Sequence, residues 1–171
     1  MVTSVLTCDM GLKGGFCLFT HNPETDTIFI NKLFPMPKKK KLGAKNSYEI
    51  DFEKLKEIFY TIVNEYSISL FLYEKQFVKE GQGYSEQIFG NQGEVVGMAR
   101  ILIPIVDFVR PQIWTKSLGV GANKRKHVQY SNANLPETMK LKNSQDGIAD
   151  AVCIALYHHK KTVLTAMRGR E

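Results

Sequence analysis

Residues 2–19 read Val-Thr-Ser-Val-Leu-Thr-Cys-Asp-Met-Gly-Leu-Lys-Gly-Gly-Phe-Cys-Leu-Phe, and this stretch decides the fold. Apolar and small polar residues alternate imperfectly up to Asp9, and a glycine-rich segment then precedes a second apolar run that begins at Phe16. A third apolar run covers residues 27–34. Short apolar runs that are separated by turn residues are typical of consecutive antiparallel strands. The N-terminal part of the chain therefore predicts an antiparallel meander with a carboxylate at the end of its first strand.

The rest of the chain alternates between the periods of helices and strands. We expect five strands, at residues 2–8, 16–19, 27–34, 68–73 and 106–109, the last extending toward Trp114. We expect three helices, at residues 52–63, 86–103 and 144–159. The proline-flanked residues 35–43 predict a loop, and residues 116–142 form a polar, basic segment. This order predicts one α/β domain over residues 1–171, a mixed five-stranded sheet flanked by helices.

The composition is that of a globular protein. Of its 171 residues 43% are hydrophobic and 23% are charged, which argues against a disordered chain. No apolar run approaches the ~18 residues of a membrane span, and the N-terminus lacks a basic start, so we expect a cytoplasmic protein without a signal peptide. Three widely spaced cysteines in apolar segments predict buried thiols, at Cys8, Cys17 and Cys153. A net charge of +6 favours a polyanionic partner.

Four acidic residues occupy positions that suit a metal site. Asp9 closes the first expected strand, Glu74 closes the fourth, and Asp146 and Asp150 share the last helix. Because the two helical acids are four residues apart, they project from one face about one turn, ~6 Å, apart. A divalent cation would relieve their repulsion, and oxygen ligands suit Mg²⁺. Two such ions could position a water beside a phosphodiester and stabilise the leaving oxygen.

Each acid also has a simpler interpretation. An aspartate at a strand end, such as Asp9, often forms a turn, and Asp146 near a helix start could complement the helix dipole. Asp150 is harder to explain in this way, because its neighbours Ile148 and Val152 belong to an apolar helix in which an unpaired carboxylate would be costly. Spacing alone leaves the structural and the metal-binding interpretations open.

The sequence resembles the RuvC-like Holliday junction resolvases, and their phage-encoded branch in particular, over nearly its whole length. Residues 9–16 resemble the first-strand aspartate and glycine turn of that family, and Glu-Lys-Gln-Phe at 74–77 resembles its fourth-strand motif. Residues 146–155, Asp-Gly-Ile-Ala-Asp-Ala-Val-Cys-Ile-Ala, resemble its C-terminal helix motif. Weaker similarities follow in the family's order at residues 97–100 and 119–124. The two helical acids of the bacterial resolvases are usually three residues apart, whereas Gly147 occupies that position here.

The resemblance implies an RNase H-like fold of the retroviral integrase type and a homodimer that cuts four-way DNA junctions symmetrically. It implies Mg²⁺, with Mn²⁺ as a substitute, and two ions in each active site. The implied catalytic and metal-binding residues are Asp9, Glu74, Asp146 and Asp150. In this chemistry a metal-activated water attacks the phosphodiester, so no covalent nucleophile is needed.

The resemblance also implies DNA contacts outside the acids. The basic residues Lys116, Lys124, Arg125 and Lys126 precede the acidic helix and resemble the family's DNA-contacting segment. Contacts of this kind with phosphates give affinity without sequence specificity. Phe77 follows the Glu74 motif in a polar stretch, and we expect it to stack on unpaired bases, with plain packing as the alternative.

Other features have two interpretations that the sequence leaves open. The lysines at 38–41 could contact phosphates or form a solvated surface. Gly93 and Gly97 would allow a close helix contact, either within the chain or with a second subunit, where the resemblance places the dimer contact. The pair His158-His159 resembles a zinc pair, but we favour the interaction of positive charge with a helix C-terminus. Trp114 is expected in the core.

The sequence thus favours a structure-selective endonuclease that resolves four-way junctions. One alternative is an RNase H-like nuclease with another branched or hybrid substrate. A second is a non-catalytic junction-binding module, in which the acids are structural and Gly147 marks the loss of activity.

Overall fold

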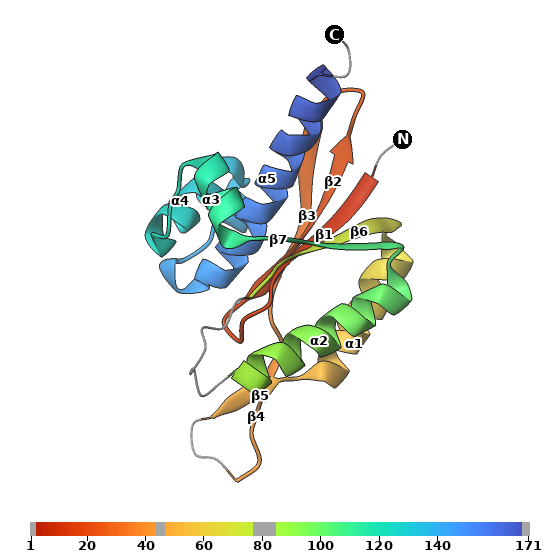
Figure 1. Cartoon of the computed structure of the whole chain (residues 1–171), viewed down its shortest axis with the longest axis vertical. Helices are drawn as coiled ribbons and strands as arrows, with labels where there is room; N and C mark the ends of the chain where they lie inside the picture. Colours follow the sequence, from red (N-terminus) through yellow and green to blue (C-terminus); the bar gives the residue numbers. More distant parts are fainter. Residues whose placement is uncertain (1–2, 44–46, 77–84, 169–171) are drawn as a thin grey trace.

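A mixed β-sheet forms the centre of the molecule (Figure 1). The computed structural model describes residues 3–43, 47–76 and 85–168. The strands are β1 (Thr3–Asp9), β2 (Gly15–Asn22), β3 (Thr27–Pro35), β4 (Lys38–Lys40), β5 (Tyr48–Ile50), β6 (Ile68–Glu74) and β7 (Ile105–Val109). Five of them make one sheet in the order β3-β2-β1-β6-β7, in which β1, β2 and β3 are antiparallel and β1, β6 and β7 are parallel. The predicted mixed five-stranded sheet is confirmed.

Helices cover both faces of this sheet (Figure 1). They are α1 (Phe52–Glu65), α2 (Ser85–Leu102), α3 (Pro111–Leu118), α4 (Lys124–Asn134) and α5 (Asp146–Arg168). One hydrophobic core joins the sheet to α1 and α2, and two others join its opposite face to α3, α4 and α5. Successive side chains of β1 point to opposite faces of the sheet. Leu6 and Cys8 therefore belong to the core under α1 and α2, whereas Val5 packs in the core with α5.

Several boundaries differ from the predicted ones. Lys38–Lys40, expected in a loop, pairs with Tyr48–Ile50 as a small separate ribbon, which a run of lysines tolerates because all three side chains remain exposed. The chain does not continue β7 toward Trp114, since Pro111 starts α3 at a position where a missing N–H costs nothing. The basic segment contains α4, whose weak apolar periodicity hid it.

The last helix is longer than predicted. It ends at Arg168 instead of His159, so the pair at 158 and 159 lies well inside α5 and not at its C-terminus. The interaction with a helix C-terminus that we favoured for these histidines is therefore wrong. Burial lowers the pKa of both side chains, which also disfavours a positive charge there.

The cysteine prediction agrees with the structure. Cys8, Cys17 and Cys153 are buried free thiols, as predicted. None of the helices among the described residues combines the length and the apolar character that crossing a membrane would take.

Candidate active site

Asp9 and Glu74 end neighbouring parallel strands. The register of β1 and β6 pairs Cys8 with Tyr73, so the acid that follows each of these residues reaches the same edge of the sheet. Asp9 is only 9% exposed, and its Oδ1 accepts a hydrogen bond from the backbone N–H of Gly11 at 3.2 Å. The glycine turn after β1 thus orients this carboxylate.

The start of α5 packs directly onto that glycine turn. Gly14 and Gly147 form a parallel β-bridge, and a Cβ atom on Gly147 would lie 2.0 Å from the carbonyl oxygen of Lys13. A Cβ on Gly14 would meet the Asp9 carbonyl oxygen at the same distance. Only glycine therefore fits at position 147, and the nearest acid on this helix, Asp146, precedes it.

Two further contacts hold α5 against the first hairpin. The Thr7 hydroxyl on β1 donates a hydrogen bond to the Ala151 carbonyl at 2.7 Å. A Cβ on Gly15 would lie 2.7 Å from the Ile148 side chain, so β2 and α5 also approach closely. This packing brings the acids of the last helix to the edge at which β1 ends.

Asp150 is fully buried and paired with two cationic side chains. Its carboxylate forms an ion pair with Lys124, and its Oδ1 lies 2.6 Å from Nδ1 of His127. The other imidazole nitrogen lies 2.8 Å from the Gly121 carbonyl oxygen. Because a carboxylate and a carbonyl both accept hydrogen bonds, the ring satisfies both contacts only when both nitrogens carry protons. Burial opposes that charge, but these contacts outweigh it and raise the pKa of His127.

Burial and the neighbouring acids raise the pKa of two of the four acids. Burial, reinforced by the charge of Asp150, raises the pKa of Asp9 to about 6, and the half-buried Asp146 adds to this shift. Burial and the charge of Asp9 raise the pKa of Glu74 to about 7. Lys124 counteracts both shifts. The four acids therefore form one electrostatic cluster, which we call the acidic edge.

Two residues that contact the acidic edge were not predicted from the sequence to do so. Trp114, expected only in the core, is 1% exposed and donates from Nε1 to Oε2 of Glu74 at 2.8 Å. His127 was not singled out at all. The available signals were a single tryptophan and a lone histidine in a polar, basic segment, but no spacing rule links either residue to an acid.

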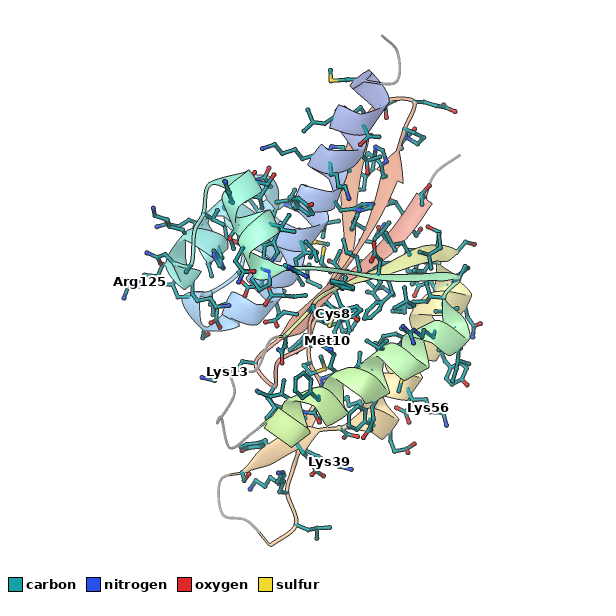
Figure 2. The ribbon with its side chains drawn as sticks, viewed as in Figure 1. Cys8, Met10, Lys13, Lys39, Lys56 and Arg125 are labelled. Atoms are coloured by element: carbon teal, nitrogen blue, oxygen red, sulfur yellow. The ribbon has the colours of Figure 1, made fainter. Side chains whose placement is uncertain are left out.

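The predicted DNA-contacting residues fall into two groups. Lys116 lies on α3, and Lys124, Arg125 and Lys126 begin α4; all four are exposed. Figure 2 shows Arg125 extending into solvent at the outer end of α4. Lys124 differs from the others because its ammonium group turns inward to Asp150. The remaining predicted contact, Phe77, lies outside the described residues.

A cavity of about 580 Å³ lies beside the glycine turn. Two lysines from different segments, Lys13 and Lys38, line it together with Tyr48 and Gln76. Positive side chains thus flank the acidic edge on the side of this cavity as well as on the side of α4. Lys38 is exposed on a strand beside this cavity, which is compatible both with contact to phosphates and with a solvated surface.

The donor set of the acidic edge fits a hard divalent cation. All four groups are carboxylates. Burial, together with the neighbouring acids, raises the pKa of Asp9 and Glu74, and a bound cation would favour their ionised forms. The ammonium group of Lys124 supplies part of the missing charge, so an ion at Asp150 would displace it. The acids are not tightly grouped: in the part of the chain that the structure describes, three such ligand atoms approach within 4.8 Å of one another at a different place, His21, Asp26 and His159.

Comparison with known proteins identifies the fold. Neither a family model nor a curated protein matches the sequence. Among solved structures, Thermus thermophilus RuvC in complex with a Holliday junction substrate aligns over 92% of both chains, with a TM-score of 0.62 and 15% identity. A further T. thermophilus RuvC structure aligns over 95% of this chain and 98% of its own, with a TM-score of 0.58 and 15% identity.

A eukaryotic protein has the same architecture. The yeast mitochondrial Holliday junction resolvase aligns over 92% of this chain and 78% of its own, with a TM-score of 0.56 and 15% identity. These similarities confirm the predicted RNase H-like fold of the RuvC type.

Proposed function

We propose that this chain, which has the fold of the RuvC-type resolvases, is a metal-dependent endonuclease that cuts four-way DNA junctions. The proposal rests on the position of four acids, Asp9, Glu74, Asp146 and Asp150, at one edge of the sheet. Besides burial, the charges of Asp150 and Asp146 raise the pKa of Asp9, and those of Asp9 and Asp150 raise the pKa of Glu74. The structures similar to this chain include RuvC with a Holliday junction substrate. The exposed basic residues beside the acidic edge suit a polyanionic substrate.

Two Mg²⁺ ions, or Mn²⁺ in their place, would be held by these four carboxylates. When bound, the ions would supply an activated water and charge stabilisation for hydrolysis of the phosphodiester. The residues around the acids act by orienting them. Trp114 positions Glu74, and His127 fixes the Asp150 carboxylate while its other nitrogen is held by Gly121.

DNA would approach across the basic residues on both sides of the acidic edge. Lys116, Arg125 and Lys126 are free of ion pairs with acids among the described residues, so their charges are available to phosphates. Lys124 would exchange Asp150 for a phosphate when a metal ion replaces its charge. Phe77 would stack on an unpaired base near the crossover.

We place the contact of a homodimer on α2. Gly90, Gly97 and Ile101 follow one another at seven- and four-residue steps, so they share one stripe of the helix. The space next to Gly93 and Gly97 is open in the described chain, which disfavours a contact within the subunit, and Ile101 is 82% exposed. A second subunit would cover this stripe and add a second active site for symmetric cleavage.

The single domain would work in the cytoplasm. Three buried free thiols are consistent with a reducing compartment.

The test is cleavage of an end-labelled synthetic four-way junction with Mg²⁺, with cuts mapped on denaturing gels. We expect symmetric cuts by the native chain and a loss of about a thousandfold or more in Asp9→Asn and Glu74→Gln. Junction binding should persist in both variants, since the basic residues are intact. Glu53→Gln, on the exposed face of α1, is the matched control and should cut normally.

Two results would contradict the proposal. Unchanged cutting by both variants would exclude the acidic edge as the active site. Binding without any product, with or without metal, would favour a junction-binding module instead. Flap and RNA–DNA hybrid substrates at equal concentration test for a nuclease of other specificity.

A further inference from the structure

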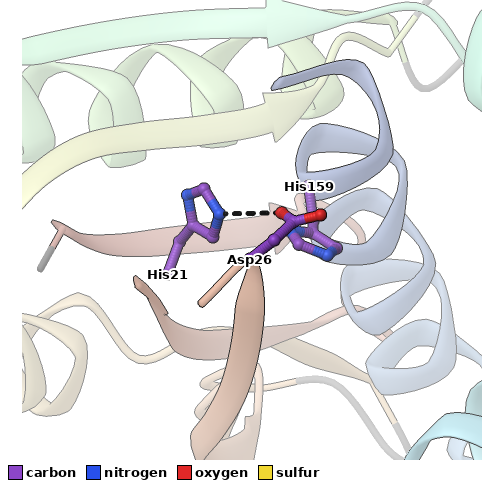
Figure 3. Close-up of side chains that lie close together, drawn as sticks. All are labelled: His21, Asp26 and His159. Atoms are coloured by element: carbon purple, nitrogen blue, oxygen red, sulfur yellow. Dashed lines mark hydrogen bonds and ion pairs between the residues drawn. The ribbon is translucent and has the colours of Figure 1, made fainter. Parts of the chain in front are cut away.

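A compact group of potential metal ligands lies at the opposite end of the sheet from the acidic edge (Figure 3). It consists of His21 on β2, Asp26 in the turn before β3, and His159 on α5. His21 pairs with Thr3 at the start of β1, whereas Asp9 ends that strand. Six residues of strand separate the two places, roughly 20 Å at ~3.3 Å per residue. The group is therefore distinct from the acidic edge.

The spacing within the group suits one ion. One nitrogen or oxygen atom from each residue lies within 4.8 Å of the other two. Nε2 of His21 and Oδ1 of Asp26 are 3.5 Å apart, which is long for a charge-assisted hydrogen bond. Bonds of ~2.0–2.1 Å around a tetrahedral zinc ion place neighbouring ligand atoms ~3.3 Å apart. The rings of His21 and His159 are 5.0 Å apart between centroids, so small side-chain rotations would converge the three ligands.

An independent observation points to an absent ligand. Nδ1 of His159 is buried and has no hydrogen-bond partner among the residues that the structure describes. A buried polar atom without a partner is costly and uncommon in folded proteins.

We propose that His21, Asp26 and His159 bind one first-row transition dication such as Zn²⁺. Two imidazoles and one carboxylate are a donor set typical of Zn²⁺ and unlike the all-oxygen set of the acidic edge. A water would complete the coordination, since an adjoining cavity of about 230 Å³ contacts His21 and Asp26. The ion would tie the β2–β3 turn to the distal part of α5, and it would stabilise the fold without taking part in cleavage.

The proposal can be tested on the full chain without DNA. Metal-free protein is titrated with Zn²⁺ by calorimetry in excess Mg²⁺, so that the oxygen ligands are already occupied. We expect one saturable equivalent of Zn²⁺ and a rise in Tm of about 5 °C or more at a hundredfold excess over Kd. Co²⁺ should give the visible absorption of a four-coordinate site with nitrogen ligands. His21→Asn and His159→Asn should each weaken binding roughly a hundredfold.

Two variants serve as controls. His158→Asn removes the adjacent histidine on α5, whose ring packs near Phe19 and not in the group, and should bind Zn²⁺ normally. Glu74→Gln should also bind one equivalent, which separates this site from the acidic edge. The absence of saturable binding, or binding that survives in His21→Asn, overturns the proposal. Circular dichroism of the metal-free variants checks folding; if His159→Asn is unfolded, His21→Asn decides.

Discussion

At the scale of single residues, Asp9 and Glu74 make the stability of the metal-free chain depend on pH. Burial and neighbouring acids raise the pKa of Asp9 from 3.8 to about 6 and that of Glu74 from 4.5 to about 7. An acid with a raised pKa in the folded state contributes stability below its unfolded pKa and loses it as pH rises through the folded value. The metal-free protein should therefore lose stability from these two groups between about pH 4 and pH 7.

The variant Asp9→Asn removes one of these charges while keeping an oxygen for the Gly11 N–H. In EDTA at pH 8 we expect it to be more stable than the native chain by on the order of 2 kcal/mol, or about 5 °C in Tm. The difference should nearly vanish at pH 4, where the native carboxyl is protonated. Mg²⁺ should reverse the order by stabilising only the native chain. Thermal denaturation monitored by circular dichroism measures the difference in Tm under all three conditions: EDTA at pH 8, pH 4, and Mg²⁺. A variant less stable than the native chain in EDTA at pH 8 would contradict the predicted destabilisation by the Asp9 charge.

Trp114 acts through Glu74, so we class it as a positioning residue. Its Nε1–H stabilises the ionised carboxylate, and Trp114→Phe removes that donor while keeping an aromatic ring in the core. The pKa of Glu74 should then rise further. At pH 7 the variant should need about tenfold more Mg²⁺ for half-maximal cleavage, and most of the loss should be recovered at pH 9. A purely structural role would leave the Mg²⁺ requirement unchanged. Tyr66→Phe is the control, because Tyr66 lies beside Lys32 at the end of α1, before the start of the strand that Glu74 ends.

At the scale of elements, the contact between α5 and the glycine turn is what joins the helical acids to the strand acids. The atoms that a Cβ on Gly147 would meet belong to the backbone of Lys13 and Gly14, which cannot rotate away. Helix α5 must therefore move if residue 147 carries a side chain.

We expect Gly147→Ala to lower the free energy of unfolding by about 2 kcal/mol or more, because the backbone has to separate. Cleavage should fall with it, since Asp146 and Asp150 would shift away from Asp9. Asn64→Ala is the control: it lies at an exposed position in helix α1, so it should be neutral or stabilising by up to ~1 kcal/mol. Urea denaturation measures both changes. Equal stabilities of the two variants would mean that the close approach at residue 147 is unimportant.

At the scale of the whole molecule, the two faces of the sheet have different roles. The face under α3, α4 and α5 carries the residues that pair with the acids, and α1 and α2 cover the other face (Figure 1). Tyr60 on α1 and Ile101 on α2 are exposed there. A groove between these two helices is lined by Tyr60 and Ile101. This surface is where we expect the second subunit.

Ile101→Glu should convert the proposed dimer into a folded monomer, because a charge would be buried in the interface. Light scattering coupled to size exclusion would detect the change, and far-UV circular dichroism should stay the same. Leu164→Glu, an exposed apolar residue on α5, is the control and should leave the dimer intact. A native chain that is monomeric at all concentrations would refute the interface.

Much of the architecture was predictable from local pattern. Alternation over residues 2–8 and helical spacing over 52–63 report which side of an element meets the core, and both elements are confirmed. The same logic placed Asp9 and Glu74 at strand ends, because the pattern stops where the strand does. The same logic failed at α4, where polar residues mask the helical period. It also failed at the end of α5, where mostly exposed residues, both polar and apolar, continue the helix beyond its buried first turns.

By itself, then, the sequence determined the five strands of the main sheet, the helices α1, α2 and α5, and the positions of the acids within them. These elements have clear repeats of two to four residues. Only the tertiary structure decided which side chains meet: Trp114 with Glu74, His127 and Lys124 with Asp150, and His21 with His159. These partners are 23 to 138 residues apart in sequence. Contacts over such distances are selected by the packing of whole helices on a sheet, which no local spacing encodes.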